Sequence, residues 1–394
     1  MNLSSLRTWI DIDLDAVVAN YRTACSLTRA RVICVLKANA YGHGAVRVAE
    51  ALAEAGCRSF AVSCGREALQ LRQAGIAGDI LVMTPAGEAE LTPLLQQGVT
   101  LTAASFRDLV QAEQAARALG EGERRYPVHL KLDSGFHRLG FACDQTTARA
   151  LADLLYGCYH LKAEGIYSHL GLVSEERDQA QCARFLQMCA WLRDAGVEIS
   201  DIHLCDSIGL VRYPQWHFSA CRVGALLFGV RPSRSDHLPF GCRETLAFRA
   251  KVSAVHDVPA GEVIGYAEEP TERPMRVATV CAGYGDGYPR RLSGGRGQVL
   301  IRGQRAPVVG LICMDQLMCD VSAIPDCSPG DTATLLGGGI PCAEMAEWAQ
   351  TNRNECLTIL SRRPVRVYRQ GGRVVSVTDE LLGIREDDAD GIAE

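Results

Sequence analysis

The chain has 394 residues, of which 47% are hydrophobic and 22% are charged, as in a globular protein with room for two domains. Its formal net charge of −5 argues against a nucleic-acid partner, and its apolar runs are too short to predict a membrane partner. The 17 cysteines are mostly scattered singly, without the paired spacing of zinc sites, so we expect no metal centre. Free thiols and the lack of a signal-peptide pattern predict a cytoplasmic protein.

The first half of the chain alternates short apolar runs with amphipathic helical patterns. Repeated units of this kind predict a parallel sheet. Their number favours a (β/α)8 TIM-like barrel over a doubly wound sheet, and no Gly-x-Gly-x-x-Gly stands at the first turn. Strands are predicted at 31–36, 59–63, 79–83, 99–102, 128–132, 165–169, 201–205 and 222–229. Helices are predicted between them, at 45–55, 65–74, 106–119, 146–156 and 177–195.

The pattern changes near residue 240, where alternating apolar segments are separated by Gly- and Pro-rich turns. We therefore predict a C-terminal β-rich domain, interrupted by one helix near 342–350. The segment 8–14 precedes the barrel pattern and is expected to pair with that domain. The acidic tail, 385–394, is expected to fray. The predicted divisions are an N-terminal strand (1–14), a barrel (15–240), a β domain (241–380) and a tail (381–394).

Lys37 stands just after the first barrel strand and opens the string Lys-Ala-Asn-Ala-Tyr-Gly-His-Gly, which also contains Tyr41. A lysine at this position is costly to bury, and its pKa can fall, which suits covalent catalysis on a carbonyl. A lone lysine after a strand would be read as a surface residue. The full string is far more specific than the lysine alone.

Further polar residues stand at the predicted carboxyl ends of barrel strands, where barrel enzymes carry their active sites. Taken singly, His169 would be a core histidine, Ser207 a helix N-cap and Arg222 a salt-bridge partner. Their placement at successive strand ends favours a shared site instead. The candidates are Lys37, Lys131, Arg138, His169, Ser207, Arg222, Gly224 and Ala225.

The predicted β domain adds two motifs, Ala-Gly-Tyr-Gly-Asp-Gly-Tyr-Pro-Arg-Arg at 282–291 and Cys-Met-Asp-Gln at 313–316. With the Lys37 string, they make the chain resemble the alanine racemase family, which comprises fold-type III pyridoxal-phosphate (PLP) enzymes, over nearly its whole length. The resemblance implies a homodimer in which Lys37 and the partner's Tyr284 are the two catalytic bases.

The same resemblance implies roles for the remaining candidates. Tyr41, Ser207 and the backbone at Gly224 and Ala225 would hold the PLP phosphate. His169 and Arg222 would also contact the cofactor, with Arg222 at the pyridine nitrogen. Arg138 would meet the PLP phenolic oxygen and, with the backbone of Met314, the substrate carboxylate. Lys131 matches a position that is often a carbamylated lysine in this family.

One departure concerns substrate choice. Asn354 stands where the family has a tyrosine at the mouth of the pocket, and this resembles the serine racemases of vancomycin-resistance systems. Those proteins usually carry a membrane-spanning domain as well. Asparagine is smaller and offers an amide donor and acceptor, so it leaves room for a hydroxymethyl side chain. Neutral drift at the pocket rim is the alternative interpretation.

The resemblance therefore predicts a PLP-dependent racemase that interconverts L- and D-alanine and supplies D-alanine for peptidoglycan. Serine is the alternative substrate, alone or beside alanine. A non-catalytic PLP-binding barrel is a rival of another class, but such proteins lack a second β domain and its tyrosine. A decarboxylase of the same fold type is a further rival, although its substrate motifs are not found.

Overall fold

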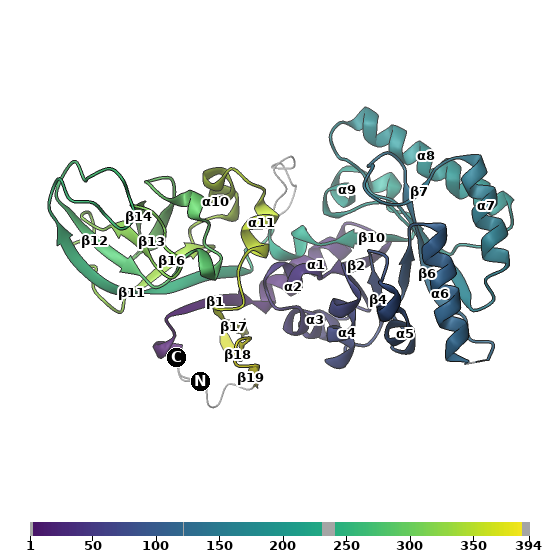
Figure 1. Cartoon of the computed structure of the whole chain (residues 1–394), viewed down its shortest axis with the longest axis horizontal. Helices are drawn as coiled ribbons and strands as arrows, with labels where there is room; N and C mark the ends of the chain where they lie inside the picture. Colours follow the sequence, from purple (N-terminus) through teal and green to yellow (C-terminus); the bar gives the residue numbers. More distant parts are fainter. Residues whose placement is uncertain (1–2, 121, 231–240, 388–394) are drawn as a thin grey trace. The chain divides into compact units, whose positions relative to one another are not determined.

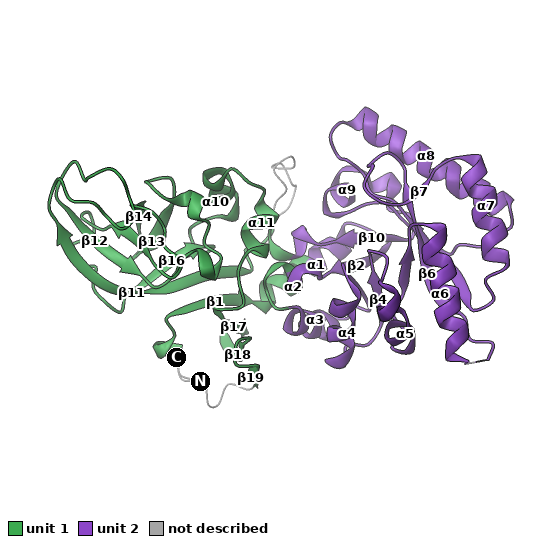
Figure 2. Cartoon of the chain, in the orientation of Figure 1, with its two compact units in different colours: residues 1–20, 41–44, 228–394 green, residues 21–40, 45–227 purple. Residues whose placement is uncertain are grey.

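The computed structural model describes residues 3–120, 122–230 and 241–387, which form two compact units (Figures 1 and 2). Unit 1 comprises Met1–Asn20, Tyr41–Gly44 and Phe228–Glu394, and unit 2 comprises Tyr21–Ala40 and Ala45–Leu227. Each unit combines segments from different parts of the chain, so the two units do not test a division of the chain into consecutive segments. The four predicted divisions of the chain, at 1–14, 15–240, 241–380 and 381–394, therefore stay a prediction.

Unit 2 contains a closed barrel of parallel strands. The strands run in the order β4-β3-β2-β10-β9-β8-β6-β5, and a parallel bridge between Leu81 and Thr100 joins the two ends. The short β7 (Phe141–Ala142) pairs only with β6. The predicted TIM-like barrel is therefore confirmed. Its strands are β2 (Arg31–Val35), β3 (Ser59–Val62), β4 (Asp79–Val82), β5 (Leu101–Ala103), β6 (Tyr126–Asp133), β8 (Leu161–Tyr167), β9 (Asp201–His203) and β10 (Ala220–Val223).

Helices alternate with these strands along the chain because their apolar positions recur on one face. In α3 (Ala45–Glu54), for example, Val48, Ala49 and Leu52 are buried. Ser105 caps the start of α6 (Phe106–Leu119) by accepting a hydrogen bond from the Asp108 N–H. The other helices are α1 (Leu14–Ser26), α4 (Gly65–Gln73), α5 (Glu88–Gln96), α7 (Gln145–Tyr156), α8 (Glu175–Asp194) and α9 (Ser207–Arg212).

Unit 1 is built on one long sheet, in the order β12-β15-β14-β13-β16-β11-β1-β17-β18-β19. The N-terminal strand β1 (Thr8–Asp13) runs antiparallel to β11 and parallel to β17, so Ile10 pairs with both Phe248 and Arg366. The predicted β-rich domain is therefore confirmed. The other strands are β11 (Leu246–Val258), β12 (Met275–Val280), β13 (Gln298–Ile301), β14 (Gln304–Val309), β15 (Leu317–Asp320), β16 (Thr332–Leu336), β17 (Val365–Gln370), β18 (Arg373–Asp379) and β19 (Ile384–Asp387).

Two helices interrupt these strands. The predicted helix near 342–350 is α10 (Cys342–Ala349), and a second helix, α11 (Arg353–Thr358), follows it after a short turn. The Asn352 side chain caps α11 by accepting a hydrogen bond from the Glu355 N–H. The helix that carries Asn354 is thus fixed at its start by a local signal that the sequence analysis had not used.

The prediction of a frayed acidic tail is wrong for its first residues. Ile384–Asp387 form β19, which pairs antiparallel with β18. The Asp379 carboxylate accepts hydrogen bonds from the Leu381 and Leu382 N–H groups, and Gly383 supplies the positive φ of +66° that the turn needs. A closed turn therefore returns the chain to the sheet edge. The rest of the tail, 388–394, lies outside the described residues.

All 17 cysteines lie among the described residues, and none of them forms a disulfide. Most of these thiols are buried in the two units, as the sequence predicts. No helix within residues 3–120, 122–230 and 241–387 combines the length and the apolar character that a membrane span requires.

Candidate active site

Lys37 begins a left-handed helical turn directly after β2. The turn is assigned as α2 (Lys37–Tyr41), yet its residues Ala38 to Tyr41 have φ between 52° and 55°, in the left-handed region. For residues other than glycine this conformation costs about 1–2 kcal/mol each. Strain of this kind persists only where the surroundings fix it, and it is typical of functional sites.

Three hydrogen bonds hold this turn. The Ala40 N–H donates to the Leu36 carbonyl over 2.8 Å, and the Ala38 N–H donates to Glu67 Oε1 over 2.6 Å. The Asn39 side chain closes the turn by accepting from the Ala45 N–H over 2.8 Å. The backbone of Lys37 is therefore anchored, while its side chain is only partly buried.

The environment of Lys37 lowers the pKa of its side chain. Burial lowers the pKa of the ammonium, and the positive charges of Arg138 and Arg222 lower it further. Glu67 acts in the opposite direction without outweighing them. A neutral lysine amine is the nucleophilic form, so Lys37 is suited to covalent binding of a carbonyl compound.

Lys131, on β6, is more deeply buried, with 6% of its surface exposed. Its Nζ donates to the Leu132 carbonyl over 2.7 Å and lies 5.4 Å from the ring centroid of Tyr167. Burial, followed by the charges of Arg222 and Arg138, lowers the pKa of Lys131 to about 7. Near neutral pH a large share of this amine is therefore unprotonated.

Arg222 lies buried on β10 with nearly all its donors engaged. Nη1 donates to His203 Nδ1 over 2.7 Å and to the His203 carbonyl over 3.1 Å. Nη2 donates to the carbonyls of Ser168 and Leu204, over 2.8 and 3.0 Å. The four terminal N–H bonds are thus used by these described acceptors. The Nε–H remains for a ligand.

Ser207 meets two backbone amides at the end of β10. Its Oγ accepts from the Gly224 N–H over 3.0 Å and from the Leu226 N–H over 3.4 Å. These amides lie at the start of the short 3-10 helix Ala225–Phe228. A group of converging N–H donors beside a hydroxyl is a favourable environment for a phosphate.

The reading of Ser207 as a helix N-cap is wrong. Asp206 caps α9 instead, since its Oδ1 accepts from the Ile208 and Gly209 N–H groups over 2.9 and 3.0 Å. A carboxylate is a good N-cap because it also interacts favourably with the helix dipole. The Ser207 hydroxyl is therefore available to the neighbouring amides.

His169 and Arg138 both contact Phe136, which the sequence analysis did not single out. The His169 ring lies edge-on to Phe136 at 4.9 Å, and the Arg138 guanidinium carbon lies 4.5 Å above the same ring. Asp133 Oδ1 accepts from the Gly135, Phe136 and His137 N–H groups and so fixes this loop. The Asp-Ser-Gly signal for such a turn is readable from the sequence. Burial and then Arg222 hold the pKa of His169 well below its usual range.

In unit 1, Tyr284 and Met314 lie on two adjacent loops. The Gly285 N–H donates to the Met314 carbonyl over 2.8 Å. The side chains of Tyr284 and Met314 are nevertheless open, with exposures of 43% and 53%. Exposed large side chains on a rigid loop pair are typical of an interaction surface.

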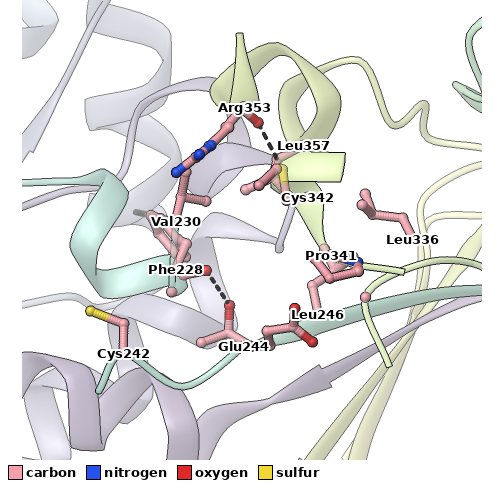
Figure 3. A pocket seen from close by; sticks show the side chains of 14 residues that line it. Phe228, Val230, Cys242, Glu244, Leu246, Leu336, Pro341, Cys342, Arg353 and Leu357 are labelled. Atoms are coloured by element: carbon pink, nitrogen blue, oxygen red, sulfur yellow. Dashed lines mark hydrogen bonds between the residues drawn. The ribbon is translucent and has the colours of Figure 1, made fainter. Parts of the chain in front are cut away.

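Tyr41 and Asn354 also belong to unit 1. Tyr41 is buried, with its ring 5.0 Å from that of Phe228, whereas Asn354 is exposed on α11. Other residues of α11, Arg353 and Leu357, help to line a pocket of about 340 Å³ (Figure 3). None of the predicted site residues lines that pocket, so it is distinct from the predicted site.

The barrel thus assembles most of the predicted residues at the carboxyl ends of its strands. Lys37 follows β2, Lys131 lies near the end of β6, His169 follows β8, Ser207 follows β9, and Arg222 lies on β10. The charges of Lys37, Lys131, Arg138 and Arg222 all lower the pKa of His169, which places them in one electrostatic neighbourhood. The roles of the individual residues stay predictions.

These residues fit PLP by their chemistry. The cofactor needs a neutral amine for its carbonyl carbon, donors for its phosphate and a partner for its ring nitrogen. The amine of Lys37, the amides that meet Ser207, and the remaining Nε–H of Arg222 are groups of these three kinds.

Comparisons with known proteins agree with this geometry. The family described as "Alanine racemase, N-terminal domain" matches residues 12–232, and "Alanine racemase, C-terminal domain" matches 245–368. An alanine racemase of Halalkalibacterium halodurans is 35% identical over 391 residues, covering 95% of this chain and 98% of the relative.

Solved structures that are similar to this chain are also alanine racemases. An alanine racemase of Clostridium difficile 630 is similar with a TM-score of 0.91 and 30% identity, covering 96% of this chain and 99% of that one. Alanine racemase from Bartonella henselae with covalently bound pyridoxal phosphate is similar with a TM-score of 0.82 and 28% identity, over 92% and 99% of the two chains.

Proposed function

Because this chain belongs to the alanine racemase family, we propose that it interconverts L- and D-alanine with two bases, Lys37 and Tyr284. The family assignment makes the protein a PLP-dependent isomerase that acts on alanine. We further propose that its D-alanine is used for peptidoglycan. The cytoplasm is the proposed compartment, since a protein rich in free thiols suits a reducing environment.

The proposed cofactor contacts are assigned residue by residue. When bound, PLP withdraws electrons from the substrate Cα and so makes its hydrogen acidic. Lys37 would bind it covalently, Arg222 would donate to its pyridine nitrogen, and Arg138 would meet its phenolic oxygen. The remaining proposed contacts are His169 on the cofactor and Tyr41, Ser207, Gly224 and Ala225 on its phosphate.

Racemisation requires a proton to leave one face of Cα and to arrive on the other. Lys37 Nζ takes or returns the proton on one face, and Tyr284 Oη does so on the opposite face. Their roles exchange with the enantiomer of the substrate. Because Arg222 is always a donor, it disfavours protonation of the pyridine nitrogen. Activation of the Cα hydrogen then depends more on well-placed bases.

The observation that carries this proposal is Lys37, whose backbone is anchored at the end of a barrel strand and whose pKa is lowered by burial. The test is exchange of the Cα hydrogen. Purified protein loaded with PLP is incubated with L-alanine in deuterated water. We expect deuterium at Cα together with D-alanine, and equal rates of approach to equilibrium from either enantiomer. Enantiomer conversion without deuterium incorporation would contradict the mechanism.

We propose a homodimer whose active sites are shared. The support is the exposure of Tyr284 and Met314 on two loops that are joined by hydrogen bonds, so both side chains are available to a partner subunit. In the proposed dimer, Tyr284 is the second base in the partner's site, and the Met314 backbone amide binds the substrate carboxylate there.

Lys131 is proposed to carry a carbamate formed with carbon dioxide. Only an unprotonated amine reacts in this way, and the pKa of about 7 supplies that form at neutral pH. The modification would replace a buried cation by an anion. The anion would then orient Arg138 through a charge-assisted hydrogen bond. Among the ion pairs of the described residues, none includes Arg138.

Serine is the second candidate substrate, and Asn354 is the residue that favours it. Its exposed position on α11 is compatible with a place at the pocket rim. A small amide there can accept or donate a hydrogen bond to a substrate hydroxyl. A non-catalytic role in PLP binding is less favoured because Tyr284 supplies a second base.

A further inference from the structure

A second polar cluster lies inside the barrel and adjoins Arg222. It consists of His129 on β6 and of Asp201 and His203 on β9, all of them buried. Their side chains have the ligand types of a metal site, and their ligand atoms lie within 4.8 Å of one another. The surroundings oppose a cation, because Asp201 already binds the Arg31 guanidinium and the Ser219 hydroxyl. A hydrogen-bonded relay accounts for the cluster better.

The direction of the relay is set by Arg222. Its Nη1–H donates to His203 Nδ1 over 2.7 Å, and a guanidinium cannot accept. Nδ1 of His203 is therefore unprotonated, and the neutral ring carries its proton on Nε2. That Nε2 lies 3.0 Å from His129 Nδ1, to which it donates. His129 consequently carries its proton on Nε2, which lies 3.8 Å from Asp201 Oδ2, close enough for an electrostatic interaction but too far for a direct hydrogen bond.

Burial keeps both imidazoles neutral, which this assignment requires. Desolvation lowers the pKa of His129 to about 4, although Asp201 acts in the opposite direction. Desolvation and the charge of Arg222 hold the pKa of His203 well below its usual range. At neutral pH each ring therefore carries one proton, and only one arrangement of the two protons satisfies every bond.

The surrounding structure is shaped around these rings. Gly165 of β8 pairs with His129 of β6. A Cβ added at Gly165 would lie 2.5 Å from three atoms of the His129 imidazole. Tyr167 stacks on His203 with ring centroids 4.8 Å apart and planes 11° from parallel. The Arg222 guanidinium lies over the same Tyr167 ring at 5.2 Å.

We propose that His129 is a positioning residue for Arg222. The relay from His129 through His203 fixes the guanidinium, so that its remaining Nε–H is presented to the pyridine nitrogen of PLP. The inference rests on the proposed function, which places Arg222 at that nitrogen. It extends the site across the barrel to a residue that contacts neither cofactor nor substrate.

Three variants distinguish an effect of the relay on Arg222 from a general loss of folding stability. His129→Leu removes the acceptor for His203, whereas His129→Gln keeps an amide acceptor and an amide donor. Gly165→Ala leaves His129 in place but pushes on its ring. His256→Leu is the matched control, because His256 is exposed on β11 in unit 1.

The first measurement is side-chain ¹⁵N NMR of the histidine-labelled holoenzyme. We expect His203 and His129 to report neutral rings protonated on Nε2 in the wild-type protein and in His256→Leu. A ring protonated on Nδ1, or on both nitrogens, at neutral pH would overturn the relay. This readout is independent of catalysis.

The second measurement uses PLP labelled with ¹⁵N at the pyridine nitrogen. In the wild-type holoenzyme we expect the resonance of an unprotonated, hydrogen-bonded nitrogen. His129→Leu and Gly165→Ala should move that resonance toward the protonated range. They should also lower kcat for alanine about tenfold, the order expected for one lost hydrogen bond. His129→Gln should retain most of the wild-type resonance position and most of the wild-type kcat. Such retention is not expected if His129 only fills space in the core.

The two ways of failing are distinct. A protonated pyridine nitrogen in the wild-type holoenzyme would overturn the proposed placement of Arg222, and with it the present inference. If the wild-type resonance is as expected but is unmoved in variants whose histidine signals change, only the positioning role of His129 fails. Gly165→Ala decides the matter if His129→Leu does not fold, since it retains every relay residue.

Discussion

The backbone N–H of Tyr284 donates a hydrogen bond of 3.1 Å to the carbonyl of Cys313. With the bond from Gly285 to Met314, it joins the two loops of unit 1 that carry the proposed second base and the proposed carboxylate-binding amide. Within the first loop, Asp286 Oδ2 accepts from the Gly283 N–H over 2.9 Å. Tyr284 and Met314 are therefore presented as one surface.

This surface predicts that Tyr284 acts in the partner subunit. Lys37→Ala and Tyr284→Phe are each expected to be inactive as homodimers. Mixing them under subunit exchange should restore activity, because each heterodimer regains one site with both bases. Recovery is measured as alanine racemisation against the fraction of heterodimer. Wild-type protein mixed with Lys37→Ala is the control, because exchange should leave its total activity unchanged. No recovery in the mixture of the two variants, despite demonstrated heterodimers, would place both bases in one chain.

Gly283 should be sensitive to the smallest substitution. A Cβ at this position would lie 2.3 Å from the Cys313 carbonyl oxygen and 2.4 Å from that of Met314. Gly283→Ala must therefore push the two loops apart, and we expect a loss of kcat with PLP still bound. Gly157→Ala is the matched control, since its nearest contact is 3.5 Å. Equal activities of the two variants would show that the loop pairing is not needed.

Lys37 is predicted to be the covalent attachment point of PLP. Lys37→Ala should yield no cofactor that borohydride can trap on the protein, because the amine that forms the bond is gone. Lys162→Ala is the control, as this lysine is exposed on β8 beside Glu164. The measurement is mass spectrometry of the reduced protein. Trapped cofactor on the Lys37 variant would show that another amine is used.

Lys131 is predicted to bind carbon dioxide in a pH-dependent way. With ¹³C-bicarbonate, we expect a protein-bound carbamate signal in the wild-type protein and in Lys162→Met, but none in Lys131→Met. The signal should decrease as the pH falls through about 7, because the amine is then protonated and unreactive. Loss of one charge-assisted hydrogen bond to Arg138 should lower kcat/KM about 10- to 100-fold in Lys131→Met.

A bound carbamate that is unaffected by Lys131→Met would assign the modification to another residue. The absence of any carbamate at pH 8, where the amine is mostly unprotonated, would make Lys131 a plain buried lysine. Arg138 would then need another anion to orient it.

The barrel could be predicted because most of its strands are short apolar runs that are followed by a helix with a 3.6-residue period. The left-handed turn after Lys37 could not be predicted in the same way. Alanine favours the right-handed helix, so the propensities of Ala38 and Ala40 oppose the observed backbone. Only contacts with Glu67 and the neighbouring turn select this conformation.

The relay of His129 and His203 shows a second limit of sequence reasoning. The two residues are 74 positions apart, and they meet because β6 and β9 flank β8 in the barrel. Period-two alternation places each side chain on a face of its strand, but not next to a particular partner. The direction of their hydrogen bonds also depends on Arg222, which lies on a third strand, β10.

Asn354 is predicted to broaden the substrate range toward serine. Replacing a phenol ring by a carboxamide opens space at the pocket rim, and the amide can satisfy the hydroxyl of serine. Such a hydrogen bond is worth about 0.5–1.5 kcal/mol, up to roughly tenfold in relative efficiency. Alanine activity should persist because its methyl group still fits.

Asn354→Tyr should therefore lower the serine-to-alanine ratio of kcat/KM by up to about tenfold. Asn354→Ala separates the two causes, since it keeps the space but removes the hydrogen bond. If the amide is responsible, Asn354→Ala should lower the ratio nearly as far as Asn354→Tyr, and if volume is responsible, it should leave the ratio unchanged. Both variants must be compared at full PLP occupancy, because an introduced phenol can also contact the phosphate. An unchanged or higher ratio in Asn354→Tyr would make this residue irrelevant to specificity and leave alanine as the sole proposed substrate.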